Sequence, residues 1–229
     1  MKKTALVLVS GLTMACAVFA HQTPPVVTAA PAPVPAPNPA PRVQPSPGGT
    51  AATQVAGKWA EEKPGAEPRY KDGKWITVTY SRPILKGRSN VFGSGAEYGK
   101  KVSSGSPVWR AGANQTTRFK TEVPLVLGGK TIPAGEYSLF VELKEAAWSL
   151  ILSTQPHQQK YDPKDKTATW GSDGYDPKFD LVKTPMKLTK TAVSFDQFSI
   201  EFVNMTQEGG TLAMWWDKEM AMVDFKVGM

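Results

Sequence analysis

Three arginines, a tryptophan and an asparagine carry most of the chain's potential for ligand chemistry. Arg82 and Arg88 lie in the segment SRPILKGR, and Trp109, Arg110 and Asn114 lie in WRAGAN. A guanidinium group presents a planar fork of N–H donors that matches the oxygens of a carboxylate, sulfate or phosphate. A tryptophan ring can stack on a sugar, and an asparagine amide can hydrogen-bond to it. These residue types predict a pocket for an anionic or carbohydrate-like ligand.

A purely structural role for the same arginines is the competing interpretation. Each arginine would then pair with an Asp or Glu and brace a loop, because an unpaired buried charge is strongly destabilising. A hydrolase, for example one acting on carbohydrates, is a further alternative. Its carboxylates would come from glutamates on or near the predicted strands, but sequence alone does not show two of them converging. Those glutamates are Glu97, Glu122, Glu136 and Glu142.

Metal and acyl-transfer chemistry have little support in the sequence. The chain has two histidines, His21 and His157, and one cysteine, Cys16, which are too few for a Cys/His zinc site. The aspartates between residues 162 and 180 do not follow the spacing of a calcium loop. No G-x-S-x-G nucleophile motif is present. We therefore expect no cofactor and no metal, and the balance favours a protein that is not an enzyme.

The elements that must position these residues are predicted to be β-strands. Apolar and polar residues alternate with period two, as in strands with one buried face. The alternating segments are 75–81, 136–143, 147–153, 197–203, 211–216 and 222–227. Turn signals occur at 127–135, 171–174, 208–210 and 216–219. We expect an all-β fold of roughly eight to eleven short, mostly antiparallel strands, arranged as a sandwich or jelly roll.

The N-terminus predicts export from a bacterial cell. Residues 1–20 combine Lys2 and Lys3 with a short apolar run and small residues before Ala20, as in a secretory signal peptide. Cleavage after Ala20 removes Cys16, whereas lipidation of Cys16 would tether the protein to a membrane as a lipoprotein. We expect a periplasmic or extracellular protein with no disulfide.

A Pro/Ala-rich tract follows at residues 21–54. Proline lacks an amide donor, so this tract is predicted to be a disordered, extended linker rather than a helix or a strand. The folded domain is then expected at residues 55–229. A spacer directly after an export signal would hold that domain away from a surface.

The distribution of charge along the chain argues against a nucleic-acid partner. The formal net charge is +7, but no long run of Lys and Arg marks a nucleic-acid surface. We expect no nucleic-acid partner and no membrane contact except through a lipid on Cys16. The predicted partner is an anionic small molecule or an envelope polysaccharide.

Three motifs in order resemble a known family. The segments TVTYSRPILKGR, VWRAGANQTT and PAGEYSLF are similar to those of a bacterial secreted family called domain of unknown function 2911, from about Trp75 to the C-terminus. The matching positions are Tyr80, Ser81, Arg82, Pro83, Gly87 and Arg88, then Trp109, Arg110, Gly112, Ala113, Asn114 and Thr117, then Pro133, Gly135 and Tyr137. The chain departs from the family pattern by the insertion KVSSGS at residues 101–106. The resemblance implies a secreted β-sandwich and no established activity.

Overall fold

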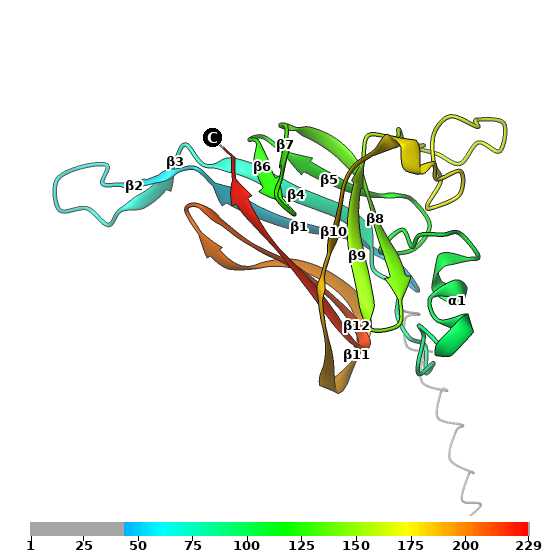
Figure 1. Ribbon diagram of the computed structural model, residues 1–229. Coiled ribbons are helices and arrows are strands. Elements are labelled where there is room, and N and C mark those ends of the chain that lie inside the picture. Colours follow the sequence, from blue (N-terminus) through cyan, green and yellow to red (C-terminus); the bar gives the residue numbers. More distant parts are fainter. Residues whose placement is uncertain (1–43, 229) are drawn as a thin grey trace, which may run out of the picture. The chain divides into compact units, whose positions relative to one another are not determined.

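The computed structural model describes residues 44–228 of the 229-residue chain. The predicted signal peptide at 1–20, with Cys16, lies outside this range, as does most of the predicted linker. The described part is mostly β-structure, as the alternation of apolar residues predicts (Figure 1). Within residues 44–228, no helix has the length and apolar character of a membrane span.

The larger sheet contains six antiparallel strands in the order β1-β4-β5-β8-β9-β10. Their bounds are β1 Gly48–Val55, β4 Lys74–Ser81, β5 Thr117–Thr121, β8 Gly135–Lys144, β9 Ala147–Ser153 and β10 Asp180–Pro185. In β4, Ile76, Val78 and Tyr80 are buried, whereas Trp75 before them is exposed and Thr77 and Thr79 between them are only partly buried. At β4, one face of this sheet therefore packs against the core and the other is turned toward water.

The second sheet has the order β11-β12-β6-β7. Its bounds are β6 Leu125–Leu127, β7 Lys130–Ile132, β11 Lys187–Thr206 and β12 Gly209–Val227. Two of its strands are long, which differs from the predicted short strands. The turn predicted at 216–219 is wrong, because β12 runs through it with Asp217 at a φ of 52°. The pairing register with β11 shifts there, so Asp217 marks a bulge that bends the strand without ending it.

Three short elements and a small hairpin complete the described fold. The hairpin pairs β2 Lys58–Ala60 with β3 Arg69–Lys71 and forms an arm. The helical turns are η1 Gly95–Glu97, α1 Lys100–Ser103 and η2 Pro177–Phe179. The arm projects from one end of the sheets, and α1 lies at the other end (Figure 1).

The core lies between the apolar faces of the two sheets. Tyr80 of β4 crosses this interface: its hydroxyl donates to the Ile200 carbonyl at 3.2 Å and accepts from the Ile200 N–H at 2.9 Å. Its ring also meets the Phe198 ring edge-on, with 5.7 Å between centroids. The sandwich arrangement predicted from the sequence therefore agrees with the packing of β4 against β11.

An aromatic cluster closes the core at the end that carries α1. Its members have exposed fractions of 4% or less and are Phe92, Trp109, Trp148, Phe198 and Trp216. Their ring centroids lie 4.8 to 6.3 Å apart, mostly in edge-to-face or tilted arrangements. Such pairs add stability beyond the area they bury.

The predicted linker boundary at residue 54 is wrong. Residues 48–54 belong to β1, which pairs with β4 from Gly48↔Ser81 to Val55↔Lys74. Ala51 and Val55 are buried. After Pro47 the chain contains no proline until well beyond β1, so every residue of GGTAATQV can donate a ladder hydrogen bond. The Pro/Ala-rich residues before this strand led to the prediction of a linker that continues to residue 54.

Removal of β1 should destabilise the domain. A chain that begins at Gln44 should keep the melting temperature of the full chain, whereas one that begins at Gly57 should melt lower by roughly 10 °C. The loss exposes the edge of β4 and takes Ala51 and Val55 out of the core. Thermal unfolding followed by circular dichroism measures the difference, and equal melting temperatures would contradict the role of β1.

Candidate functional site

The loop that carries the central motif is tied to the core at both ends. The Trp109 backbone exchanges two hydrogen bonds of 2.8 Å with Val141 of β8. The Trp109 indole N–H donates to the Gly112 carbonyl at 3.2 Å, and the Thr117 hydroxyl donates to the Ala111 carbonyl at 3.0 Å. These contacts fix the path of the loop between Trp109 and β5.

The backbone of this loop explains two of the residue types in the motif. A Cβ atom on Gly112 would lie 2.8 Å from the Ser81 carbonyl oxygen, and Gly112 has a φ of 156°. Asn114 has a φ of 59°, in the left-handed region that asparagine tolerates better than most residues. Gly112 and Asn114 therefore shape the loop, whatever else they contact.

The stacking role predicted for Trp109 does not fit the structure. Its exposed fraction is 0%, because Phe92, Trp148, Phe198 and Trp216 cover the ring. Trp109 borders the pocket described below, but it offers no free face to a ligand. The side chain is an anchor of the loop.

Arg82 does not join the other predicted residues. Its guanidinium donates to the Ser199 hydroxyl at 3.1 Å, and its backbone N–H donates to the Pro47 carbonyl at 2.8 Å. The aliphatic part lies so close to Gly49 that a Cβ there would be 2.5 Å from the Arg82 Cδ. The strand β4 ends directly before Arg82, as Pro83 predicts. Arg82 contacts β1 and β11 and does not face either of the pockets described below.

Three cations and an asparagine border a pocket of about 300 Å³, which we call the cationic pocket. Its polar side chains are those of Ser46, Arg88, Lys101, Ser104, Arg110 and Asn114. The structure thus brings together Arg88, Arg110 and Asn114 of the predicted set, although Arg88 comes from a different loop than Arg110 and Asn114. No Asp or Glu of residues 44–228 lines this pocket.

Arg88 is held by carbonyl oxygens and an aromatic ring. Its Nε donates to the Leu85 carbonyl at 2.8 Å and its Nη2 donates to the Ile84 carbonyl at 2.9 Å. The guanidinium carbon lies 5.7 Å from the centre of the Trp216 ring. No carboxylate of the described chain forms an ion pair with Arg88, so its charge is positioned without being neutralised.

Arg110 is the most constrained of the three cations. Its Nη1 donates to the Asn114 carbonyl at 3.1 Å and its Nη2 to the Ser104 hydroxyl at 3.5 Å, while Nε is buried with no partner in the described chain. Burial lowers the pKa of Arg110, and the charge of Asp173 only partly offsets this. A Cβ on Gly171 would lie 2.7 Å from the Arg110 Cζ, so the guanidinium packs against glycine backbone.

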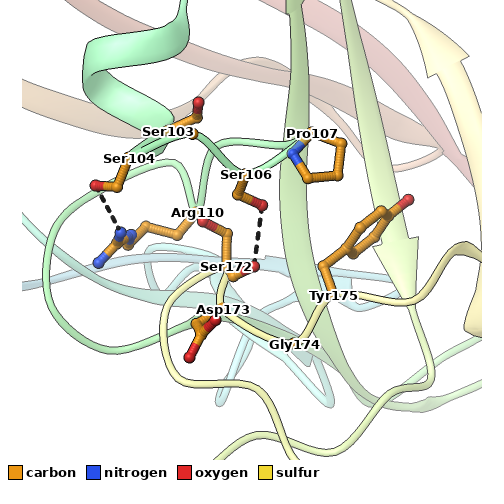
Figure 2. Close-up of a pocket in the computed structure, with 10 residues that line it drawn as sticks. Ser103, Ser104, Ser106, Pro107, Arg110, Ser172, Asp173, Gly174 and Tyr175 are labelled. Atoms are coloured by element: carbon orange, nitrogen blue, oxygen red, sulfur yellow. Dashed lines mark hydrogen bonds between the residues drawn. The ribbon is translucent and has the colours of Figure 1, made fainter.

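A second pocket also borders Arg110 (Figure 2). We call it the serine pocket; its volume is also about 300 Å³. Its polar lining comes from Ser103, Ser104, Ser106, Arg110, Ser172 and Asp173. The Ser106 hydroxyl donates to the Ser172 carbonyl at 3.0 Å, which joins the loop after α1 to the turn at 171–174.

The sequence prediction missed Lys101, Ser104 and the serines of the second pocket. Most of them lie in residues 101–106, the segment that departs from the family pattern. The only sequence feature that could have indicated them is the lysine and three serines of this segment, which closely precede the motif WRAGAN. Ser172 and Asp173 lie in the predicted turn GSDG, where polar residues are ordinary and carry no signal of their own.

The glutamates of the hydrolase alternative do not meet at either pocket. Glu136 lies near Arg118 and His157, and Glu142 pairs with Lys183 and Lys144. In the same way Glu97 pairs with Lys100, and Glu122 accepts the backbone N–H of Trp75. Among the described residues, no three His, Cys, Asp or Glu side chains gather as a metal site.

The similarity to a protein family covers most of the described chain. A family model matches residues 64–225. The chain belongs to the family described as protein of unknown function (DUF2911). This confirms the resemblance read from the three motifs, with a start somewhat before Trp75. Searches of curated proteins and of solved structures found no match.

Loss of the Trp109 anchor should destabilise the whole domain. Trp109→Ala should lower the free energy of unfolding by about 3–5 kcal/mol, because it leaves a cavity in the aromatic cluster. The control is Trp59→Ala on the arm, where the side chain is 63% exposed and the change should stay below about 1 kcal/mol. Urea unfolding measures both, and equal effects would contradict the anchor role.

Gly171 should be needed for the position of Arg110. Gly171→Ala and Gly174→Ala both place alanine at positive φ, at 64° and 75°, so both share a backbone cost of about 1 kcal/mol. Only position 171 brings a Cβ against Arg110, since Gly174 has open space. Gly171→Ala should therefore lower the free energy of unfolding further than Gly174→Ala, and equal losses in urea unfolding would contradict the contact.

Proposed function

We propose that the domain is an exported binding module of the bacterial cell envelope, without catalytic activity, that binds an anionic ligand in the cationic pocket. The observation that carries the proposal is the meeting of Arg88, Lys101 and Arg110 around one cavity that no carboxylate of the described chain lines. Like charges brought together repel one another, and an anion relieves that repulsion.

The state of Arg110 supports a ligand over an internal brace. A half-buried guanidinium is normally stabilised by an ion pair with a carboxylate. Arg110 has only a carbonyl and a hydroxyl as hydrogen-bond partners in the described chain, and the nearby Asp173 carboxylate forms no ion pair with it and only partly offsets its burial. These contacts orient the group but do not neutralise it. The Nε atom of Arg110 is buried with no partner in the described chain, which lowers the stability of the folded protein. An oxyanion bound at the guanidinium would offset this loss of stability.

The size of the pocket suits a small anionic group. A volume of about 300 Å³ lies at the lower end of the range for small-molecule sites. It accommodates a carboxylate, sulfate or phosphate together with part of the molecule that carries it. Asn114, exposed at the rim, supplies an amide for a further hydrogen bond.

The proposed location rests on the N-terminal sequence. The signal pattern at 1–20 and the Pro/Ala tract after it favour export and a spacer between the domain and a surface. Cleavage after Ala20 would release the protein into the periplasm or medium, whereas lipidation of Cys16 would tether it. Intact-mass measurement of the protein from its native host distinguishes the two.

A charge-removing substitution tests the binding proposal. Arg110→Met should leave the melting temperature of the ligand-free protein unchanged or raise it, because it removes an unneutralised, half-buried charge. The same substitution should abolish the stabilisation that sodium sulfate or phosphate gives to the intact protein at constant ionic strength. Thermal-shift assays and calorimetric titration measure both effects.

Lys130→Met is the matched control, since Lys130 is exposed on β7 and borders neither pocket. It should keep the response to sulfate and phosphate. If Arg110→Met unfolds the domain and neither anion stabilises the intact protein, Arg110 is a structural brace and the proposal is wrong.

A further inference from the structure

The serine pocket differs in charge from the cationic pocket beside it. Arg110 is its only cation, and the carboxylate of Asp173 lies on the same lining. The remaining polar groups are serine hydroxyls. This cavity therefore has no net charge of its own, yet it is rich in groups that both donate and accept hydrogen bonds.

Two buried polar groups on this lining have no partner in the described chain. They are the Ser172 hydroxyl, on a residue with an exposed fraction of 1%, and the Arg110 Nε. A buried polar atom left unsatisfied costs about 1–3 kcal/mol and is uncommon in native proteins. Both residues line one cavity, so a bound molecule there would lie next to these two groups, and a small rearrangement of the lining would let it complete their hydrogen bonds.

The ring of Tyr175 forms part of the apolar lining of the serine pocket. The Tyr175 hydroxyl donates to the Asp180 Oδ2 at 2.6 Å, and the ring packs edge-on against Phe140 at 5.1 Å between centroids. Tyr175 is thereby held in place and contributes its ring to the cavity, opposite the serines and next to Pro107 (Figure 2). An aromatic ring beside hydroxyl groups suits the C–H face of a sugar.

Arg110 and Ser104 border both cavities. The two pockets thus share a wall, and one molecule that lies over this wall contacts both. Asp173 would set the orientation of such a molecule, because its carboxylate repels an anion from the serine pocket and accepts hydrogen bonds from hydroxyl groups.

We propose that a single acidic sugar occupies both pockets, with its anionic group in the cationic pocket and its hydroxyl groups in the serine pocket. This inference rests on the proposed function and names the class of ligand. It follows from the charge difference between the two cavities, their shared wall and the unpartnered Ser172 hydroxyl. A phosphosugar and a uronic acid share this chemistry, and paired probes separate them.

Calorimetric titration of the full chain with paired probes tests the inference. The first pair is glucose 6-phosphate and inorganic phosphate; the second is glucuronate and acetate. In at least one pair the sugar acid should bind tenfold tighter or more than the simple anion, which corresponds to about 1.4 kcal/mol. Glucose alone should bind far more weakly than the preferred sugar acid.

Ser172→Ala tests the serine pocket separately from the cationic pocket. It should reduce the tenfold advantage of the sugar acid to about twofold or less and leave the affinity for the simple anion unchanged. The variant should fold as well as the parent, because the lost hydroxyl has no partner in the described chain. The control is Ser94→Ala, an exposed serine outside both pockets that caps no helix with its side chain.

Asp173→Asn gives a second readout at an exposed position. Loss of the carboxylate should preserve or increase the affinity for the simple anion, while the advantage of the sugar acid falls.

The outcomes separate this inference from the proposed function. If phosphate or acetate binds but neither sugar acid binds more tightly, the inference is overturned and the proposed function stands. If no anion binds, both fail. Binding of glucose as tightly as the sugar acids would also overturn the inference, because the anionic group would then contribute nothing.

Discussion

The burial of Trp109 is the constraint on which this end of the molecule depends. The indole ring fills the aromatic cluster, and its N–H donates to the Gly112 carbonyl two residues after Arg110. A short loop held in this way cannot fold back into the core, so Arg110 lies outside the aromatic cluster and packs, half-buried, against the turn that contains Gly171. The side chain that the sequence suggested as a stacking surface instead orients its neighbour.

The cations around the pocket are oriented by groups that do not neutralise them. Backbone carbonyls hold Arg88, and the glycine backbone of Gly171 and the Asn114 carbonyl hold Arg110. Such an arrangement costs stability in the absence of a ligand and reduces the reorganisation that binding requires. A protein under selection for stability alone would pair these cations with carboxylates; the described lining of the cationic pocket contains none, and Asp173, on the serine pocket, only partly offsets the burial of Arg110. The energetic cost is therefore the strongest argument for a ligand.

Much of the sandwich could be predicted from period-two alternation, because a half-buried strand shows its buried face in sequence. The strand β1 escaped prediction since the Pro/Ala tract before it dominated the local composition, and the bulge at Asp217 resembled a turn. At the site, residue type identified Arg88 and Arg110. It could not separate them from Arg82, nor show that Trp109 is covered, because those outcomes depend on packing between distant strands. The polar residues 101–106 were visible as an insertion, but only the structure places them at both pockets.

The central claim is that Arg88, Lys101 and Arg110 form an anion site positioned by the Trp109-anchored loop. Crystals soaked in sodium selenate test it most directly, since the anomalous signal of selenium locates the bound anion without ambiguity. The account predicts a selenate within hydrogen-bond distance of the Arg110 guanidinium and close to Arg88 and Lys101 in the cationic pocket. Selenate bound only elsewhere on the surface, with this pocket holding water alone, would contradict it.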